Sequence, residues 1–263
     1  MFKAFYLMFQ NEQTKKTFIK NCINLFLVFL IIIGLFLLMM YLIFSESVYG
    51  LLFVFIAPLM IIPTLLSMGY FWKMVENIID RRTDIVSSSI YGGKVNLIES
   101  IEIPNIKFFS YIWKGFAGSV AVLIMEIPVF VLLLYCLIYK NEQFIPAVIA
   151  VQVLIWILSP GLYWNYAKEN SIFSILNVYV AGHLFENKPG RYIWNALLSI
   201  ISWGICIAIA YFLEFIIGVP SSINSVFDAV KTVIPTLILF VPYLYVLHVH
   251  AFLIGTLGNS NDF

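Results

Sequence analysis

Charged residues are scarce in this chain of 263 residues: only 11% are Asp, Glu, Lys or Arg, whereas 62% are hydrophobic. Soluble domains carry roughly 25% charged and about 45–50% apolar residues. A soluble fold of this size cannot hide such an excess of apolar side chains from water. The scarcity of charge excludes a soluble nucleotide-binding enzyme, a disordered tail protein and a secreted disulfide scaffold. It predicts a polytopic membrane protein.

Sequence signals for paired cysteines, nucleic-acid binding, catalysis and metal binding are missing as well. The three cysteines, Cys22, Cys136 and Cys206, lie far apart without a CxxC pair, which indicates small apolar fillers. A net charge of +1 without a basic run gives no field for nucleic acid. P-loop, GxGxxG, GxSxG and HExxH motifs are absent, so we expect neither an enzyme nor a cofactor. His248 and His250, at spacing i,i+2, point to different helix faces, which disfavours a metal site.

Six long apolar stretches are the main feature that is present. Each reaches the roughly 20 residues that a helix needs to cross a hydrocarbon core of about 30 Å. They cover residues 23–44, 49–72, 115–139, 144–164, 192–217 and 233–253. The predicted fold is therefore all-α, with a six-helix transmembrane domain over 23–257, cytoplasmic bridges at 73–114 and 165–191, and a short tail at 258–263.

Lysine and arginine are distributed unevenly between the two sides of these spans. Of the 15 such residues, only Lys140 and Lys231 fall on one side of the predicted spans, in the loops after the third and the fifth span, and the others fall on the side that holds the N-terminus. Because positive residues are retained in the cytoplasm, we predict a multi-pass protein of the cell (cytoplasmic) membrane with both termini inside. The loops on the outer side are short, so a soluble partner is expected to dock from the cytoplasm.

Residues 1–22 form a segment of interfacial character ahead of the first span. Phe2, Phe5 and Phe9 recur at helical spacing, and lysines follow them. This pattern is typical of an amphipathic helix that lies in the headgroup layer. It fits either a surface anchor or an elbow helix that grips a partner subunit. Shorter amphipathic stretches follow Pro104 and occupy 170–187.

A possible internal repeat relates the two halves of the chain. Gly69-Tyr-Phe-Trp72 follows the second span and Gly161-Leu-Tyr-Trp164 follows the fourth. Tyr111-Ile-Trp113 opens the third span and Tyr192-Ile-Trp194 opens the fifth. The four tryptophans are predicted interfacial anchors, since Trp favours the membrane–water boundary, and that preference alone also explains the pattern. A true duplication would place a pseudo-twofold axis along the membrane normal, with a ligand path or lipid groove between the units.

Several of these motifs carry a resemblance to a known family. Gly69-Tyr70 ends the second span, a charged helix runs through Arg81-Arg82, Pro104 makes a turn, and Gly115 opens the next span. The arrangement resembles a bacterial and archaeal integral membrane family of unknown function. Its members show a Gly-Tyr pair after a helix pair, a cytoplasmic Pro turn and a glycine opening the next span. The resemblance implies a six-helix membrane fold and carries no known activity.

A weaker similarity is to the permease subunits of ABC exporters, which also combine six spans with a cytoplasmic N-terminus and an amphipathic N-terminal helix. It implies that the charged segment after the second span couples to a separate cytoplasmic ATPase or to another membrane subunit. The docking residues would then be Lys73, Glu76, Asp80, Arg81 and Arg82.

Glu126 is the strongest candidate for chemistry within a span, because it lies near the middle of residues 115–139. A charge at that depth costs roughly 2.5–3.5 kcal/mol, so the side chain needs a polar cavity, a partner or a proton. Pro128 frees a backbone carbonyl nearby. The pair fits proton or cation coupling or a ligand contact, and it equally fits a neutral packing residue. Glu214 lies near the outer end of its span and can reach water.

These features together predict a transport or transport-accessory subunit that handles a lipid, a peptide or a small molecule in contact with the bilayer. The alternative is a non-transporting scaffold or an immunity-type protein.

Overall fold

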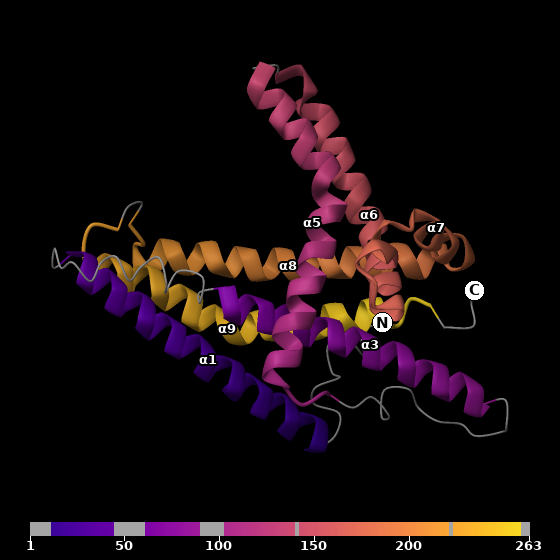
Figure 1. The fold of residues 1–263 in the computed structure, drawn as a ribbon, viewed down its shortest axis with the longest axis horizontal. Coiled ribbons are helices and arrows are strands. Elements are labelled where there is room, and N and C mark those ends of the chain that lie inside the picture. The colour runs from indigo at the N-terminus through magenta and orange to yellow at the C-terminus, as the bar shows by residue number, and fades with distance from the viewer. Residues whose placement is uncertain (1–11, 45–60, 90–102, 140–141, 221–222, 259–263) are drawn as a thin grey trace.

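All elements in the described part of the chain are helical. The computed structural model describes residues 12–44, 61–89, 103–139, 142–220 and 223–258. The long helices are α1 (Glu12–Phe44), α3 (Ile62–Ser89), α5 (Phe108–Tyr139), α6 (Ile145–Glu169), α8 (Pro189–Ile217) and α9 (Val226–Gly255). The short ones are α7 (Val178–Asn187) and the 3₁₀ helices η4 (Glu142–Phe144) and η5 (Ile172–Leu176) (Figure 1). The predicted all-α class is confirmed.

Five of these helices are long and apolar enough to cross a membrane, namely α1, α5, α6, α8 and α9. They match five of the six predicted spans. The predicted span 49–72 falls partly on residues outside the described part, and α3, which holds the rest of it, is not one of the five. The count of six therefore stays a prediction.

The helices extend well beyond the apolar stretches that predicted them. With 32 residues at about 1.5 Å each, α5 is about 48 Å long, which exceeds a hydrocarbon core of about 30 Å. The amphipathic stretch after Pro104 is accordingly the first part of α5. Residues 12–22 of the predicted N-terminal helix are likewise the first turns of α1, and residues 1–11 lie outside the described part.

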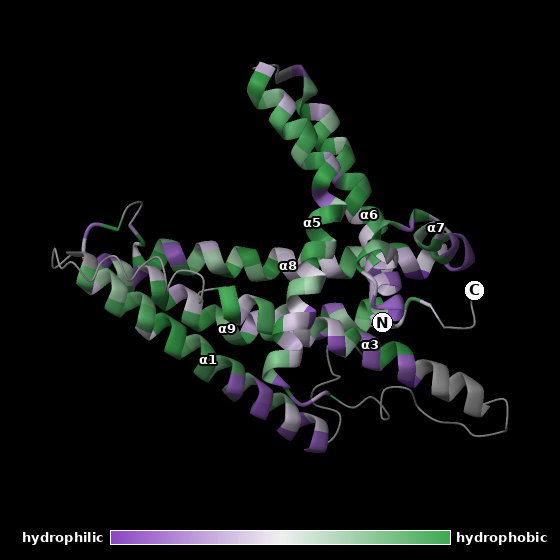
Figure 2. Ribbon diagram, in the orientation of Figure 1, coloured by the Kyte–Doolittle hydropathy of each residue, from purple (hydrophilic) through white to green (hydrophobic). Residues whose placement is uncertain are grey.

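The helices form two arms that meet at one end (Figure 1). Helices α5 and α6 form an antiparallel hairpin that projects away from the group made by α1, α8 and α9, while α3 packs against α5 and α9 at the base. The outer half of the hairpin is mostly apolar in this view (Figure 2), and the polar side chains of Glu126 and Gln152 within it bond to each other. Water is a poor solvent for such a surface, whereas acyl chains are a good one.

Local signals determine where the helices begin and end. Helix α6 stops at Asn170, whose φ of 52° is left-handed, a conformation that Asn tolerates well. Helix α8 begins with a proline at its first position and ends at Gly218, with φ of 65°. The Ser225 hydroxyl caps α9 by accepting from the Asp228 N–H at 3.2 Å. Each of these local signals therefore marks the beginning or the end of a helix.

The core of the junction between the arms is aromatic, and it corrects one prediction. Trp113 and Trp194 are exposed, as interfacial anchors must be, but Trp72 and Trp164 are both 0% exposed. A fully buried ring cannot contact headgroups, so these two are packing residues. The physical reason is a close helix approach: Gly118 leaves room for the Trp72 indole, which any Cβ there would overlap.

Candidate functional site

Two glycines bring α3 and α5 into direct contact. A Cβ at Gly69 would overlap the backbone carbonyl of Tyr111, and a Cβ at Gly115 would overlap that of Leu65. Hydrogen in place of a side chain therefore allows the two backbones to touch, as small residues do at membrane helix interfaces. This crossing aligns the polar residues that follow Gly69 on α3 with those that precede Gly115 on α5.

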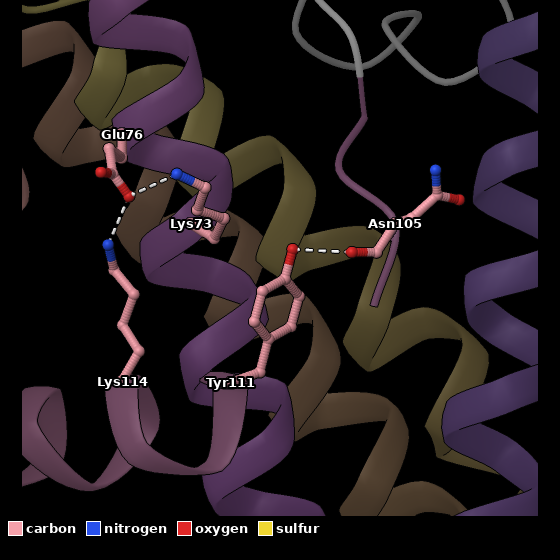
Figure 3. A network of polar contacts seen from close by, with 5 residues as sticks. All are labelled: Lys73, Glu76, Asn105, Tyr111 and Lys114. Atoms are coloured by element: carbon pink, nitrogen blue, oxygen red, sulfur yellow. Dashed lines mark hydrogen bonds and ion pairs between the residues drawn. The ribbon is translucent and has the colours of Figure 1, made fainter. Parts of the chain in front are cut away.

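A polar network lies at this crossing (Figure 3). The Glu76 carboxylate accepts a hydrogen bond from Lys73 at 3.0 Å and another from Lys114, so that lysines from two helices hold one carboxylate. The Tyr111 hydroxyl donates to the backbone carbonyl of Asn105 at 2.8 Å, which ties the segment before α5 to the helix itself. The network thus joins α3, α5 and the chain that leads into α5.

The network borders a cavity of about 580 Å³, which we call the lysine pocket. It is lined by three lysines, Lys73, Lys107 and Lys114, and by one acidic side chain, Glu76. The lining also includes two tyrosines, Tyr111 and Tyr166, and the exposed Trp113.

The pKa of Glu76 reflects these contacts. Burial acts to raise it, but the hydrogen bonds from Lys114 and Lys73 outweigh burial and hold the pKa below the ordinary value of 4.5. A carboxyl whose pKa is lower in the folded state stabilises the fold above its unfolded pKa. That contribution is lost as the pH falls through the folded value.

Replacing Glu76 is therefore expected to change the pH dependence of stability. Glu76→Gln should lower the free energy of unfolding by about 1.5 kcal/mol at neutral pH, the net worth of hydrogen bonds to a charged group. The difference from the parent protein should begin to shrink as the pH falls below about 4.5 and should vanish below the folded pKa of Glu76. Chemical denaturation in detergent between pH 3 and pH 7 measures it. Glu169→Gln, at an exposed position, is the control, and an equal loss in both variants would contradict the role of the network.

A second network is buried among α1, α3 and α9. Asn21 donates to the Tyr70 hydroxyl at 3.1 Å and to the Pro104 carbonyl at 2.8 Å, and the Tyr70 hydroxyl lies 2.7 Å from Nε2 of His248. Nδ1 of His248 is 2.6 Å from the Leu244 carbonyl, which can only accept. His248 therefore carries its proton on Nδ1, and Tyr70 donates to Nε2.

One apolar cavity lies where the arms diverge, and a second lies within the group of α1, α3, α8 and α9. The first, which we call the fork cavity, has about 390 Å³ between α6 and α8, and its few polar side chains include Ser159, Ser199 and His250. The second has about 440 Å³ among α1, α3, α8 and α9. Trp203 and Ile207 line both. The Trp203 indole donates to Nδ1 of His250 at 3.0 Å, so that histidine keeps its proton on Nε2.

The sequence candidates within the membrane lie apart from these cavities. Glu126 is half-buried in the hairpin and accepts a hydrogen bond from Gln152 at 3.3 Å, so it has found a polar partner. Pro128 is exposed one half-turn further along α5, and Glu214 is exposed near the outer end of α8. None of the three lines either cavity or the lysine pocket.

The predicted docking residues divide into two groups. Lys73 and Glu76 are held in the polar network, whereas Asp80 and Arg81 are exposed further along α3. The side chain of Arg82 lies outside the described part. Sequence reasoning did not single out Lys107, Lys114 or Asn21. The sequence signals that could have indicated these residues are an Asn directly before an apolar span, for Asn21, and lysines on either side of the Tyr111-Ile-Trp113 motif, for Lys107 and Lys114.

The two units of the proposed repeat make comparable contacts. Gly69 packs on the backbone of Tyr111, and the Gly161 N–H donates to the hydroxyl of Tyr192 at 3.1 Å. Each pair joins the Gly-x-aromatic-Trp motif to the Tyr-Ile-Trp motif of the same unit. The contacts differ in detail, because one involves a backbone and the other a side chain.

The described part of the chain is helical, and its five long apolar helices are consistent with an integral membrane protein, in which all backbone hydrogen bonds within the bilayer are satisfied inside helices. Comparison of the chain with family models, curated proteins and solved structures finds no match.

Proposed function

We propose that this membrane protein is a transport or transport-accessory subunit that takes up an apolar or amphipathic molecule, such as a lipid, in the fork cavity. The observation that carries the proposal is the cavity itself, at about 390 Å³, between two arms of apolar helices. Ligand sites of this kind are mostly apolar with a few placed polar groups. His250, Ser159 and Ser199 supply such groups here.

The proposed repeat bears on where this cavity lies. If the two units are related, one holds α3 and α5 and the other holds α6 and α8, so the fork cavity belongs to the second unit. The matching pairs Gly69–Tyr111 and Gly161–Tyr192 favour this relation. The bias of lysine and arginine further supports a cytoplasmic position for the base of the fork and for both termini.

Filling the cavity is the sharpest test. Gly204 lines it, and a Cβ built there meets no atom within 4 Å. Gly204→Phe is expected to weaken binding of an apolar occupant at least about tenfold, or ~1.4 kcal/mol. Photolabelling by a diazirine fatty acid in nanodiscs, mapped by mass spectrometry onto α6 and α8, measures occupancy. Dithionite quenching of a labelled phospholipid in proteoliposomes measures its movement between leaflets.

The matched control is Gly34→Phe on α1. Gly34 also has open space around it, and it lines neither cavity. The added ring should face lipid and leave labelling of α6 and α8 unchanged. Labelling that is spread evenly over the lipid-facing helices and is indifferent to Gly204→Phe would instead favour the scaffold or immunity-type alternative.

A further inference from the structure

The lysine pocket has an excess of positive charge that its own residues do not neutralise. Glu76 offsets one lysine, yet both Lys73 and Lys114 bind it. Lys107 is exposed and has no ion pair with any described residue. Three lysines and one carboxylate line the same cavity of about 580 Å³, which leaves an excess of roughly two positive charges and favours an anion.

A tyrosine at the pocket supplies a neutral donor. Tyr166 lines the pocket although the residue as a whole is only 1% exposed, so its hydroxyl is available to a ligand there and not to bulk solvent. An acceptor inside the pocket would pair with this hydroxyl. Phosphate oxygens are such acceptors, and lysine binds phosphate as a point charge.

The position of the pocket favours a particular source for that phosphate. Trp113, which is 71% exposed, lies at its edge, and its neighbours Phe108 and Phe109 are exposed as well. Exposed aromatics beside lysines are characteristic of the headgroup layer. The pocket therefore opens at the depth where lipid phosphates lie.

We propose that the lysine pocket binds a phosphate group with net negative charge, with Lys107 and Lys114 as cationic contacts and the Tyr166 hydroxyl as a neutral donor. The site is separate from the fork cavity, in residues and in chemistry, so the proposal goes beyond the transport role and does not depend on it.

Native mass spectrometry of the full chain from a neutral detergent tests the proposal. Short-chain phosphatidate, short-chain phosphatidylcholine and inorganic phosphate are added separately. Phosphatidate is expected to bind at least about tenfold more tightly than phosphatidylcholine. Lys107→Gln should weaken phosphatidate binding about tenfold, as loss of a charged contact does. Tyr166→Phe, which keeps the ring and removes the donor, should weaken it by about threefold to tenfold.

Lys16→Gln is the matched control, because Lys16 is an exposed lysine on the same predicted side and does not line the pocket. It should leave binding unchanged. Binding of phosphatidate alone supports a lipid headgroup, and comparable binding of inorganic phosphate supports a free phosphate. Equal binding of phosphatidylcholine, or an equal effect of Lys16→Gln and Lys107→Gln, would overturn the proposal.

Discussion

Gly69→Ala is expected to destabilise the protein by about 3 kcal/mol or more, the upper range for overpacking. A methyl group at this position would overlap the backbone of Tyr111, and a backbone cannot move aside as a flexible side chain can. Relief therefore requires separation of α3 from α5, which opens the lysine pocket and the aromatic junction together. Unfolding in a graded detergent titration, followed by circular dichroism, measures the loss.

Two companion variants sharpen this result. Gly115→Ala should be comparably damaging, because its methyl group would overlap the Leu65 carbonyl on the other side of the same crossing. Gly34→Ala should be neutral or slightly stabilising, since it has open space and alanine is the better helix former by about 1 kcal/mol. Similar unfolding curves for all three variants would show that α3 and α5 do not touch in the membrane.

Tyr70→Phe is expected to cost about 2 kcal/mol although it removes a single oxygen atom. That oxygen accepts from Asn21 and donates to His248, so its loss leaves two buried polar groups on α1 and α9 without this partner. The cost of unpaired buried groups is larger than the net worth of one hydrogen bond. The ring itself is retained, so its packing should persist.

The control for this prediction is Tyr211→Phe, at an exposed tyrosine of α8. A surface change of this kind is expected to stay within about 0.5 kcal/mol. Nitrogen-15 spectra of labelled histidine should in addition show that Tyr70→Phe shifts the Nε2 signal of His248 and leaves that of His250 in place. Equal stability of both variants would mean that the network contributes nothing net.

The features that depend on local sequence were predictable. Span positions follow from length and hydropathy along the chain, which is why five of them match helices long enough to cross a bilayer. The i,i+2 spacing of His248 and His250 predicts that the two side chains point to different helix faces. Their separate hydrogen bonds, of His248 with Tyr70 and of His250 with Trp203, confirm this prediction.

The features that depend on distant residues were not predictable from patterns. Gly69 and Gly115 are 46 positions apart, and no periodicity within either helix indicates that they meet. Burial of Trp72 follows from that contact, so the expectation of an interfacial ring failed for the same reason. The lysine pocket was missed because Lys107 and Lys114 served only as indicators of sidedness, and only the fold brings them to the same cavity as Lys73 and Glu76.

Trp203 and Ile207 line both apolar cavities, so the two volumes share these side chains as a boundary. A hydrogen bond to His250 and ring contacts with Tyr243 and His250 hold the Trp203 indole. The longest guest that either cavity can accept is therefore limited by a ring that α9 fixes in place, and a longer guest would have to break those contacts.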